Sequence, residues 1–155
     1  KMSLKNISML CTGGDFLYAA QGNEIYSFRF VNNKYILLSH VRIKSKIDSI
    51  SGDKKSVVVI DTQGKSYYMT NNLKGICIFN FDVNNYKINS FLNSPFLLIS
   101  QYNKILLYIF IDGQWRLKKN IEETKNGIIR MIRMNHDCSK ICISDQNNIY
   151  FYTLS

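Results

Sequence analysis

The amino-acid sequence predicts an all-β protein built from repeated four-stranded antiparallel sheets. Short runs of β-branched and aromatic residues cover most of the chain, and no stretch has the spacing of an amphipathic helix. One pattern occurs four times: a strand, a polar turn, an apolar strand, a short turn containing Gln with Gly or Asn, and an aromatic strand. Residues 57–60 and 105–111 are apolar at successive positions, as expected for strands covered on both faces.

The first two copies of the pattern each contain four expected strands. In the first copy the strands are predicted at residues 6–11, 16–20, 24–30 and 35–43. In the second copy they are predicted at residues 47–51, 57–60, 65–70 and 76–81. Glycine, asparagine and aspartate lie between the strands, and these residues tolerate the positive φ angles of tight hairpins. The first two sheets therefore extend over about 6–43 and 47–81.

The third copy is complete, whereas the fourth stops after its third strand. The third copy has expected strands at residues 88–92, 95–100, 105–111 and 114–119. The fourth has expected strands at residues 128–134, 140–144 and 148–154. The last two sheets are thus about 88–119 and 128–154.

Equivalent turn residues measure the repeat. Gly22, Gly64, Asn103 and Asn147 are separated by intervals of 42, 39 and 44 residues. A period of about 40 to 45 residues with four strands per repeat is typical of β-propeller blades. A β-trefoil, the main alternative, would need three longer repeats, and other β-sandwiches or barrels are further alternatives.

The fourth copy also carries a family resemblance. Residues 132–152 are similar to the strand, turn, strand, turn, strand core of a WD repeat. The chain resembles the WD-repeat β-propellers over all four copies, although no copy has the Trp-Asp pair that names the family. The resemblance implies a non-catalytic scaffold that binds partner proteins in a multiprotein complex.

The number of blades raises the question of how the ring closes. Rings of this type commonly contain about seven blades, so this chain supplies roughly half of one. Residues 1–155 would then form one propeller-like unit or part of one. The chain could belong to a longer polypeptide, pair with another copy or another protein, or close alone as a small ring. We expect that additional blades are needed, because half a ring exposes an apolar sheet face and unpaired strand edges.

Composition gives broader expectations. The 155 residues are 46% hydrophobic with a formal charge of +9, which suits one globular domain. No apolar run approaches the roughly 18 residues of a membrane helix, and no secretory signal opens the chain, so no membrane association is expected. Four cysteines with no zinc-binding spacing predict reduced thiols and a cytoplasmic or nuclear location: Cys11, Cys77, Cys138 and Cys142.

Catalytic motifs are not evident in the sequence. His40 is expected in an outer strand and His136 in a turn, without a recognisable nucleophile beside either. The pair Glu122 and Glu123 is expected in a solvated connection, and residues 52–56 fit a hairpin turn better than a phosphate-binding loop. We expect no enzymatic activity, cofactor, metal ion or small-molecule substrate.

Basic residues form the candidate interaction site. The candidate residues are Arg42, Lys44, Lys46, Lys54, Lys55, Trp115, Arg116, Lys118 and Lys119. Arg42, Lys44 and Lys46 alternate and would project from one face of an extended strand, a series that His40 would extend. Both clusters belong to expected outermost strands, where lysines can simply protect a sheet edge. Alternatively they form a basic rim for RNA phosphates or an acidic protein surface, with Trp115 either an anchor or packed in the blade.

A second functional interpretation is an RNA-facing accessory subunit. Residues 10–20 and 23–28 resemble the opening blade of the non-catalytic WD subunit of tRNA guanine-N7 methyltransferases. The resemblance implies that the chain would supply shape and basic surface while a partner performs methyl transfer.

Overall fold

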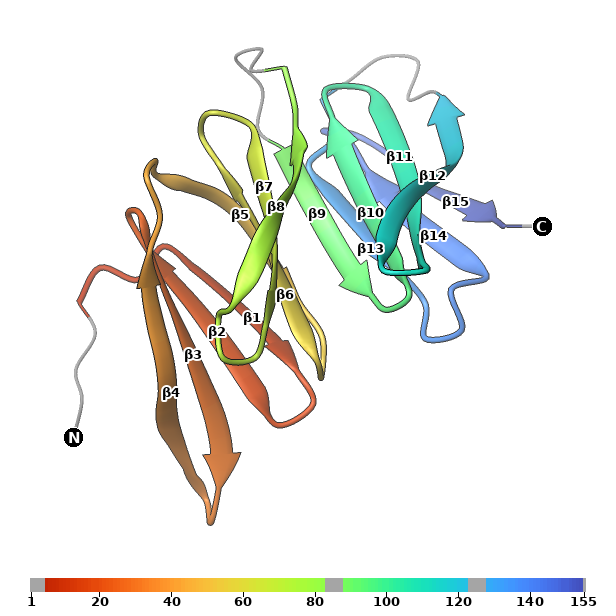
Figure 1. The fold of residues 1–155 in the computed structure, drawn as a ribbon. Helices are drawn as coiled ribbons and strands as arrows, with labels where there is room; N and C mark the ends of the chain where they lie inside the picture. The colour runs from red at the N-terminus through yellow and green to blue at the C-terminus, as the bar shows by residue number, and fades with distance from the viewer. Residues whose placement is uncertain (1–4, 83–87, 123–127, 155) are drawn as a thin grey trace. The chain divides into compact units, whose positions relative to one another are not determined.

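The computed structural model describes residues 5–82, 88–122 and 128–154, which form fifteen strands in four antiparallel sheets (Figure 1). The all-β prediction and the blade-like grouping of the strands are therefore confirmed. The described residues include no helix that could span a membrane.

In each sheet the strands lie side by side in the order in which they occur along the chain. The first sheet contains β1 (Met9–Gly13), β2 (Phe16–Gln21), β3 (Glu24–Val31) and β4 (Lys34–Arg42). The second contains β5 (Ile47–Gly52), β6 (Ser56–Asp61), β7 (Lys65–Thr70) and β8 (Gly75–Asn80). The third contains β9 (Ile88–Asn93), β10 (Phe96–Gln101), β11 (Lys104–Ile111) and β12 (Gln114–Glu122). The fourth contains β13 (Met131–Met134), β14 (Lys140–Ser144) and β15 (Ile149–Thr153).

Most strand boundaries lie within one residue of the prediction, but three strands differ by more: β1, β13, and β12, which ends at Glu122 instead of residue 119. β1 begins and ends later than expected because its turn to β2 needs only Gly14 and Asp15, with Gly14 at a φ of 58°. The strand predicted from residue 128 begins at Met131. Just before it, the backbone N–H of Ile129 donates to the carbonyl of Tyr102 in the turn between β10 and β11 (3.1 Å).

The chain divides into two separately packed units, residues 1–83 and 84–155, each with two sheets. In the first unit one face of the first sheet packs against β5 and β6, with Tyr18 and Ile25 fully buried. The Tyr18 hydroxyl donates to Oδ1 of Asn71 beyond β7 (2.8 Å). Position 52 requires glycine because a Cβ there would lie 2.6 Å from the Tyr18 ring. The two sheets are therefore closely fitted.

The second unit repeats this packing with the third and fourth sheets. Its core contains the side chains Leu98, Ile105, Leu107, Ile121, Ile129, Ile132, Met134, Ile141 and Ile143. Side-chain amides join the two sheets as well: Nδ2 of Asn89 donates to the carbonyl of Ile129 (3.1 Å), and that of Asn93 to the carbonyl of Asn135 (3.2 Å). Apolar contacts and the hydrogen bonds from these side-chain amides hold the third and fourth sheets together.

All three four-stranded sheets carry a β-bulge between their third and fourth strands. The extra residues are Leu38, Ile78 and Lys118, at intervals of 40. A bulge shifts the register by one residue and increases the local twist. In the outermost strands β4, β8 and β12, the bulge therefore determines on which face of the sheet each side chain lies.

Candidate interaction surfaces

The first predicted basic cluster is only partly on a strand. β4 ends at Arg42, and Lys44 and Lys46 lie exposed in the connection to β5. The chain leaves the strand because Ile43 turns into the core: its N–H donates to the carbonyl of Asn23 (2.9 Å), and its carbonyl accepts from Nδ2 of Asn23 (2.9 Å). The expected alternation along one strand therefore includes only His40 and Arg42.

Lys54 and Lys55 are exposed in the turn between β5 and β6, as expected. The six residues of β5 separate this turn from Lys46. At about 3.3 Å per residue, the two groups lie about 20 Å apart at opposite ends of the strand. The basic residues of the first unit therefore do not form one rim.

The second cluster lies on the outermost strand of the third sheet. Arg116, Lys118 and Lys119 are exposed on β12, and Nζ of Lys118 lies 5.0 Å from the centre of the Phe96 ring. No carboxylate of the described residues forms an ion pair with these three side chains. Trp115 is half-buried and its ring packs against Phe110, with ring centres 5.1 Å apart. Trp115 therefore lies against Phe110 at the tip of the β11–β12 hairpin.

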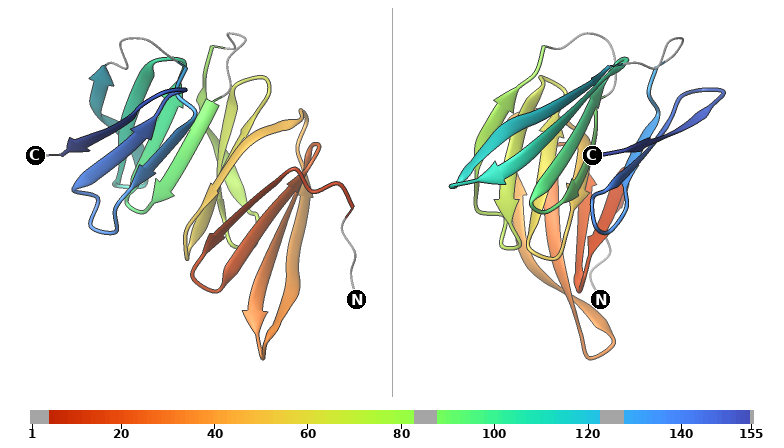
Figure 2. Two further views of the ribbon diagram at one scale, coloured as in Figure 1. Left: turned by 180° about the vertical axis from the view of Figure 1, so that it is seen from behind. Right: turned by 90° about the vertical axis from the view of Figure 1, so that its right-hand side faces the viewer.

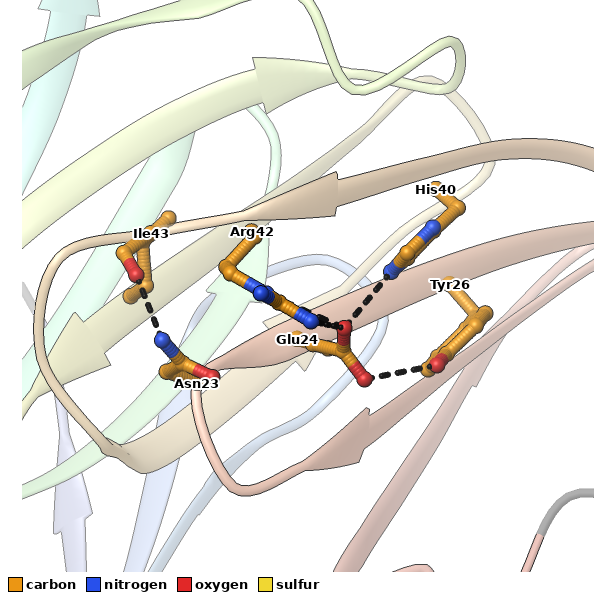
Figure 3. Close-up of polar contacts among 6 residues, drawn as sticks. All are labelled: Asn23, Glu24, Tyr26, His40, Arg42 and Ile43. Atoms are coloured by element: carbon orange, nitrogen blue, oxygen red, sulfur yellow. Dashed lines mark hydrogen bonds and ion pairs between the residues drawn. The ribbon is translucent and has the colours of Figure 1, made fainter.

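Arg42 is engaged by a carboxylate that the sequence analysis did not single out (Figure 3). Nη2 and Nε of Arg42 donate to Oε1 of Glu24, at 2.6 and 3.1 Å. The Tyr26 hydroxyl donates to Oε2 (2.9 Å), and Nε2 of His40 lies 3.5 Å from Oε1. The His40 and Tyr26 rings stack with centres 4.4 Å apart. Glu24 thus organises the end of β4 and offsets the charge of Arg42.

These contacts change the acidity of the carboxyl. The hydrogen bond from Arg42 is the main cause that lowers the pKa of Glu24, and the bond from Tyr26 lowers that pKa further. The same carboxylate raises the pKa of Arg42. Both residues are therefore charged over the neutral range.

The first half of β4 is exposed and apolar. Tyr35, Ile36, Leu37 and Leu38 are between 38% and 52% exposed, and Phe30 of β3 packs beside Tyr35 with ring centres 5.0 Å apart. We call these five residues the β4 apolar edge. The far ends of β3 and β4 extend past the turn between β1 and β2, as Figure 1 and Figure 2 show.

A second apolar surface lies on the fourth sheet. Its apolar residues share one face in the strand registers, on which Arg133 and Lys140 also lie exposed. We call the apolar residues the open face: Met131, Cys142, Ile149 and Phe151. Ile149 is 65% exposed and Phe151 is 79% exposed. The opposite face of the same strands is buried against the third sheet. β15 is also an outermost strand, because the described part of this sheet has three strands.

The remaining candidates lie apart from these surfaces. His136 is exposed in the turn between β13 and β14, as predicted. Burial raises the pKa of the Cys11 thiol to about 12, so this group is protonated at neutral pH. Glu122 ends β12, and Glu123 lies outside the described residues. Residues 5–82, 88–122 and 128–154 contain no cluster of His, Cys, Asp and Glu side chains that could hold a metal ion.

Solved structures share this arrangement of strands. Hsv2 of Kluyveromyces marxianus superposes with a TM-score of 0.73 at 13% identity, over 98% of this chain and 48% of Hsv2. The dihydro-heme d1 dehydrogenase NirN superposes with a TM-score of 0.68 at 12% identity, over 96% of this chain and 34% of NirN. The computationally designed protein Ika4 superposes with a TM-score of 0.70 at 9% identity, over 100% of this chain and 95% of Ika4. The chain has a β-propeller fold.

The comparisons establish the fold alone. The chain spans about half the length of the Hsv2 structures that it matches. No protein-family model and no curated protein sequence matches it. The β-propeller prediction made from the repeat is confirmed, and function must be inferred from the surfaces described above.

Proposed function

We propose that this chain is a non-catalytic β-propeller scaffold that binds other protein chains. The open face of the fourth blade carries this proposal. In the other blade of the same unit, the corresponding face, with Leu98 and Leu107, is buried against a neighbouring sheet. Exposed apolar surface of this kind usually marks a protein contact. A partner that supplies further blades would cover Ile149 and Phe151 as β14 and β13 cover the third blade.

The solution mass of the chain tests the proposal. Light scattering should give a mass above 18.0 kDa, since contact between open apolar faces favours association. The variant I149K/F151K should reduce the assembly without changing the circular dichroism spectrum. The control I76K/I111K replaces two other exposed apolar side chains and should leave the mass unchanged. A monomer of 18.0 kDa at every concentration, or an assembly insensitive to I149K/F151K, would contradict the proposal.

A second candidate function, an RNA-facing accessory subunit, is favoured by β12. Its three exposed basic side chains lie close together on one strand, where they could contact successive phosphates. Arg42 contributes less to this candidate because Glu24 engages it.

An electrophoretic mobility shift with structured RNA at about 50 mM salt tests this alternative. The variant R116E/K118E/K119E should abolish the shift, whereas the control K54E/K55E, at a turn of the other unit, should retain it. A shift that is absent from the wild type, or that survives the triple reversal, rejects RNA binding through β12.

A further inference from the structure

The most unusual outer strand of the molecule is β4. Among the described residues it pairs on one side only, with β3, so its other edge carries backbone groups without a strand partner there. Such an edge is a template for another strand, and proteins usually protect it with charged residues. β4 instead presents four apolar residues in succession, Tyr35 to Leu38, all exposed.

The register divides these side chains between the two faces of the blade. Tyr35 and Leu37 lie opposite Phe30 and Phe28, on one face, whereas Ile36 lies opposite Arg29 on the other. Leu38 is the extra residue of the bulge. A strand added beside β4 would therefore find apolar contacts on both of its faces as well as backbone hydrogen bonds.

The hairpin is held in shape before anything binds. Asn32 and Asn33 have φ angles of 49° and 59°, the two positive values of a type I′ turn. The tilted ring pair of Phe30 and Tyr35 fixes the tip, and the Glu24 contacts fix the opposite end of β4 (Figure 3). An edge prepared in this way loses little conformational freedom on binding.

The charges around β4 indicate which kind of segment would bind beside it. Residues 25–47 contain five basic residues and no aspartate or glutamate, and Asp15 lies beside Phe30, whose N–H donates to the Asp15 carbonyl (2.7 Å). Lys34 is exposed just before the apolar stretch and Arg29 is exposed on β3 opposite Ile36, so two cations face one carboxylate there, whereas Arg42 at the far end is neutralised by Glu24. The field at the β4 apolar edge is therefore positive, which favours a chain with acidic side chains between its apolar ones.

We propose that β4 is a docking edge for an extended, acidic and apolar segment of a partner protein, which adds to the first blade as a fifth strand. This inference rests on the proposed scaffold function and identifies a class of partner for it. It concerns a different surface from the open face of the fourth blade, so each proposal can fail without the other.

The third blade supplies a matched variant. Its register repeats that of the first blade at an offset of 80 residues, so Ile36, Leu38 and Ser39 correspond to Arg116, Lys118 and Lys119. The variant I36R/L38K/S39K therefore places on β4 the residues that the equivalent strand already carries. It should fold normally, as judged by circular dichroism and thermal melting.

Fluorescence polarisation with two labelled octapeptides provides the test. One peptide alternates glutamate with valine, and the other alternates lysine with valine. The wild-type chain should bind the acidic peptide at least about tenfold more tightly than the basic one, because of charge complementarity. I36R/L38K/S39K should weaken binding of the acidic peptide at least about tenfold by protecting the edge. R29E/K34E should reverse the preference, and the control I76K on β8 should change nothing.

Four results would overturn the proposal. The first is equal binding of both peptides, and the second is binding that survives I36R/L38K/S39K in a folded protein. The third is a dimer that the same variant dissociates, which would identify a second copy as the occupant. The fourth is sedimentation with anionic phospholipid vesicles without peptide binding, which would identify a lipid surface. Because I149K/F151K does not alter β4, it should leave peptide binding unchanged, and this separates failure here from failure of the proposed function.

Discussion

The hairpins β3–β4 and β11–β12 have the same framework and opposite edges. Each outer strand has nine residues, and each hairpin has its bulge at the same place, Leu38 or Lys118. The tips carry the same tilted ring pair, Phe30 with Tyr35 at 5.0 Å and Phe110 with Trp115 at 5.1 Å. The two hairpins therefore share one backbone arrangement and differ in the side chains that their outer strands expose.

The edges differ at the residues that face solvent. Next to its ring pair β12 carries Arg116, Lys118 and Lys119, which discourage pairing with another strand. At the equivalent places β4 carries Ile36, Leu38 and Ser39. The contrast teaches that exposure alone does not define an interaction surface, since both strands are exposed and only one is left unprotected.

The largest expected effect tests the shared framework. Ile25 and Ile105 are equivalent, fully buried residues of β3 and β11. Ile25→Ala and Ile105→Ala should each lower the free energy of unfolding by about 2–5 kcal/mol, because each leaves a cavity in the core. Urea titration measures both, with the exposed Ile36→Ala as a control that should stay within about 0.5 kcal/mol. Very unequal losses at the two buried sites would show that the hairpins are not equivalent.

The next prediction reverses the edge chemistry of β12. R116I/K118L/K119S gives this strand the residues of β4 and should increase self-association about tenfold, because an unprotected apolar edge pairs with other edges. Light scattering over a concentration series measures the effect. R116Q/K118Q/K119Q removes the same charges without adding apolar side chains and is the control. If both variants associate equally, loss of charge rather than edge pairing is responsible.

Local signals made most of the strands predictable. Gly22, Gly64 and Gly113 have positive φ angles in turns that the sequence identified, so the strands between the turns followed. The outermost position of β4 and β12, and the turn position of Lys54 and Lys55, were predicted in the same way and are observed.

The contact between Glu24 and Arg42 could not be predicted in that way. Counting outward from the turn at Asn32 and Asn33 places Glu24 opposite Val41. The bulge at Leu38 shifts the register by one residue, so that Arg42 lies opposite Glu24 instead. A bulge depends on twist and packing rather than on a local motif, so the sequence pattern alone does not show that Glu24 engages Arg42.

A smaller effect concerns the charge at the end of the first hairpin. In the folded chain Arg42 and Tyr26 lower the pKa of Glu24 below its value in the unfolded chain. The group therefore stabilises the fold at pH values above the unfolded pKa, and this stability is lost as the pH falls through the folded pKa.

Glu24→Gln should accordingly lower the melting temperature at pH 7 and have progressively less effect below about pH 4. Thermal melting between these values measures the difference from the wild type. The control Lys34→Gln removes an exposed charge at the other end of β4 and should show no such loss of effect in acid. A Glu24→Gln difference that is independent of pH would contradict the role of this ion pair.

The smallest effect compares the two tips. Asn33 and Gly113 occupy the same place in their turns, with φ angles of 59° and 77°. Glycine adopts positive φ without steric cost, and Asn-Gly and Asp-Gly are preferred in type I′ turns. Asn33→Gly should therefore stabilise the first hairpin by a few tenths of a kcal/mol, and Gly113→Asn should destabilise the other by a similar amount. Open space surrounds a Cβ at Gly113, so backbone conformation alone sets the sign. Urea titration of both variants measures the shifts, and shifts of equal sign would show that the tips are held by different forces.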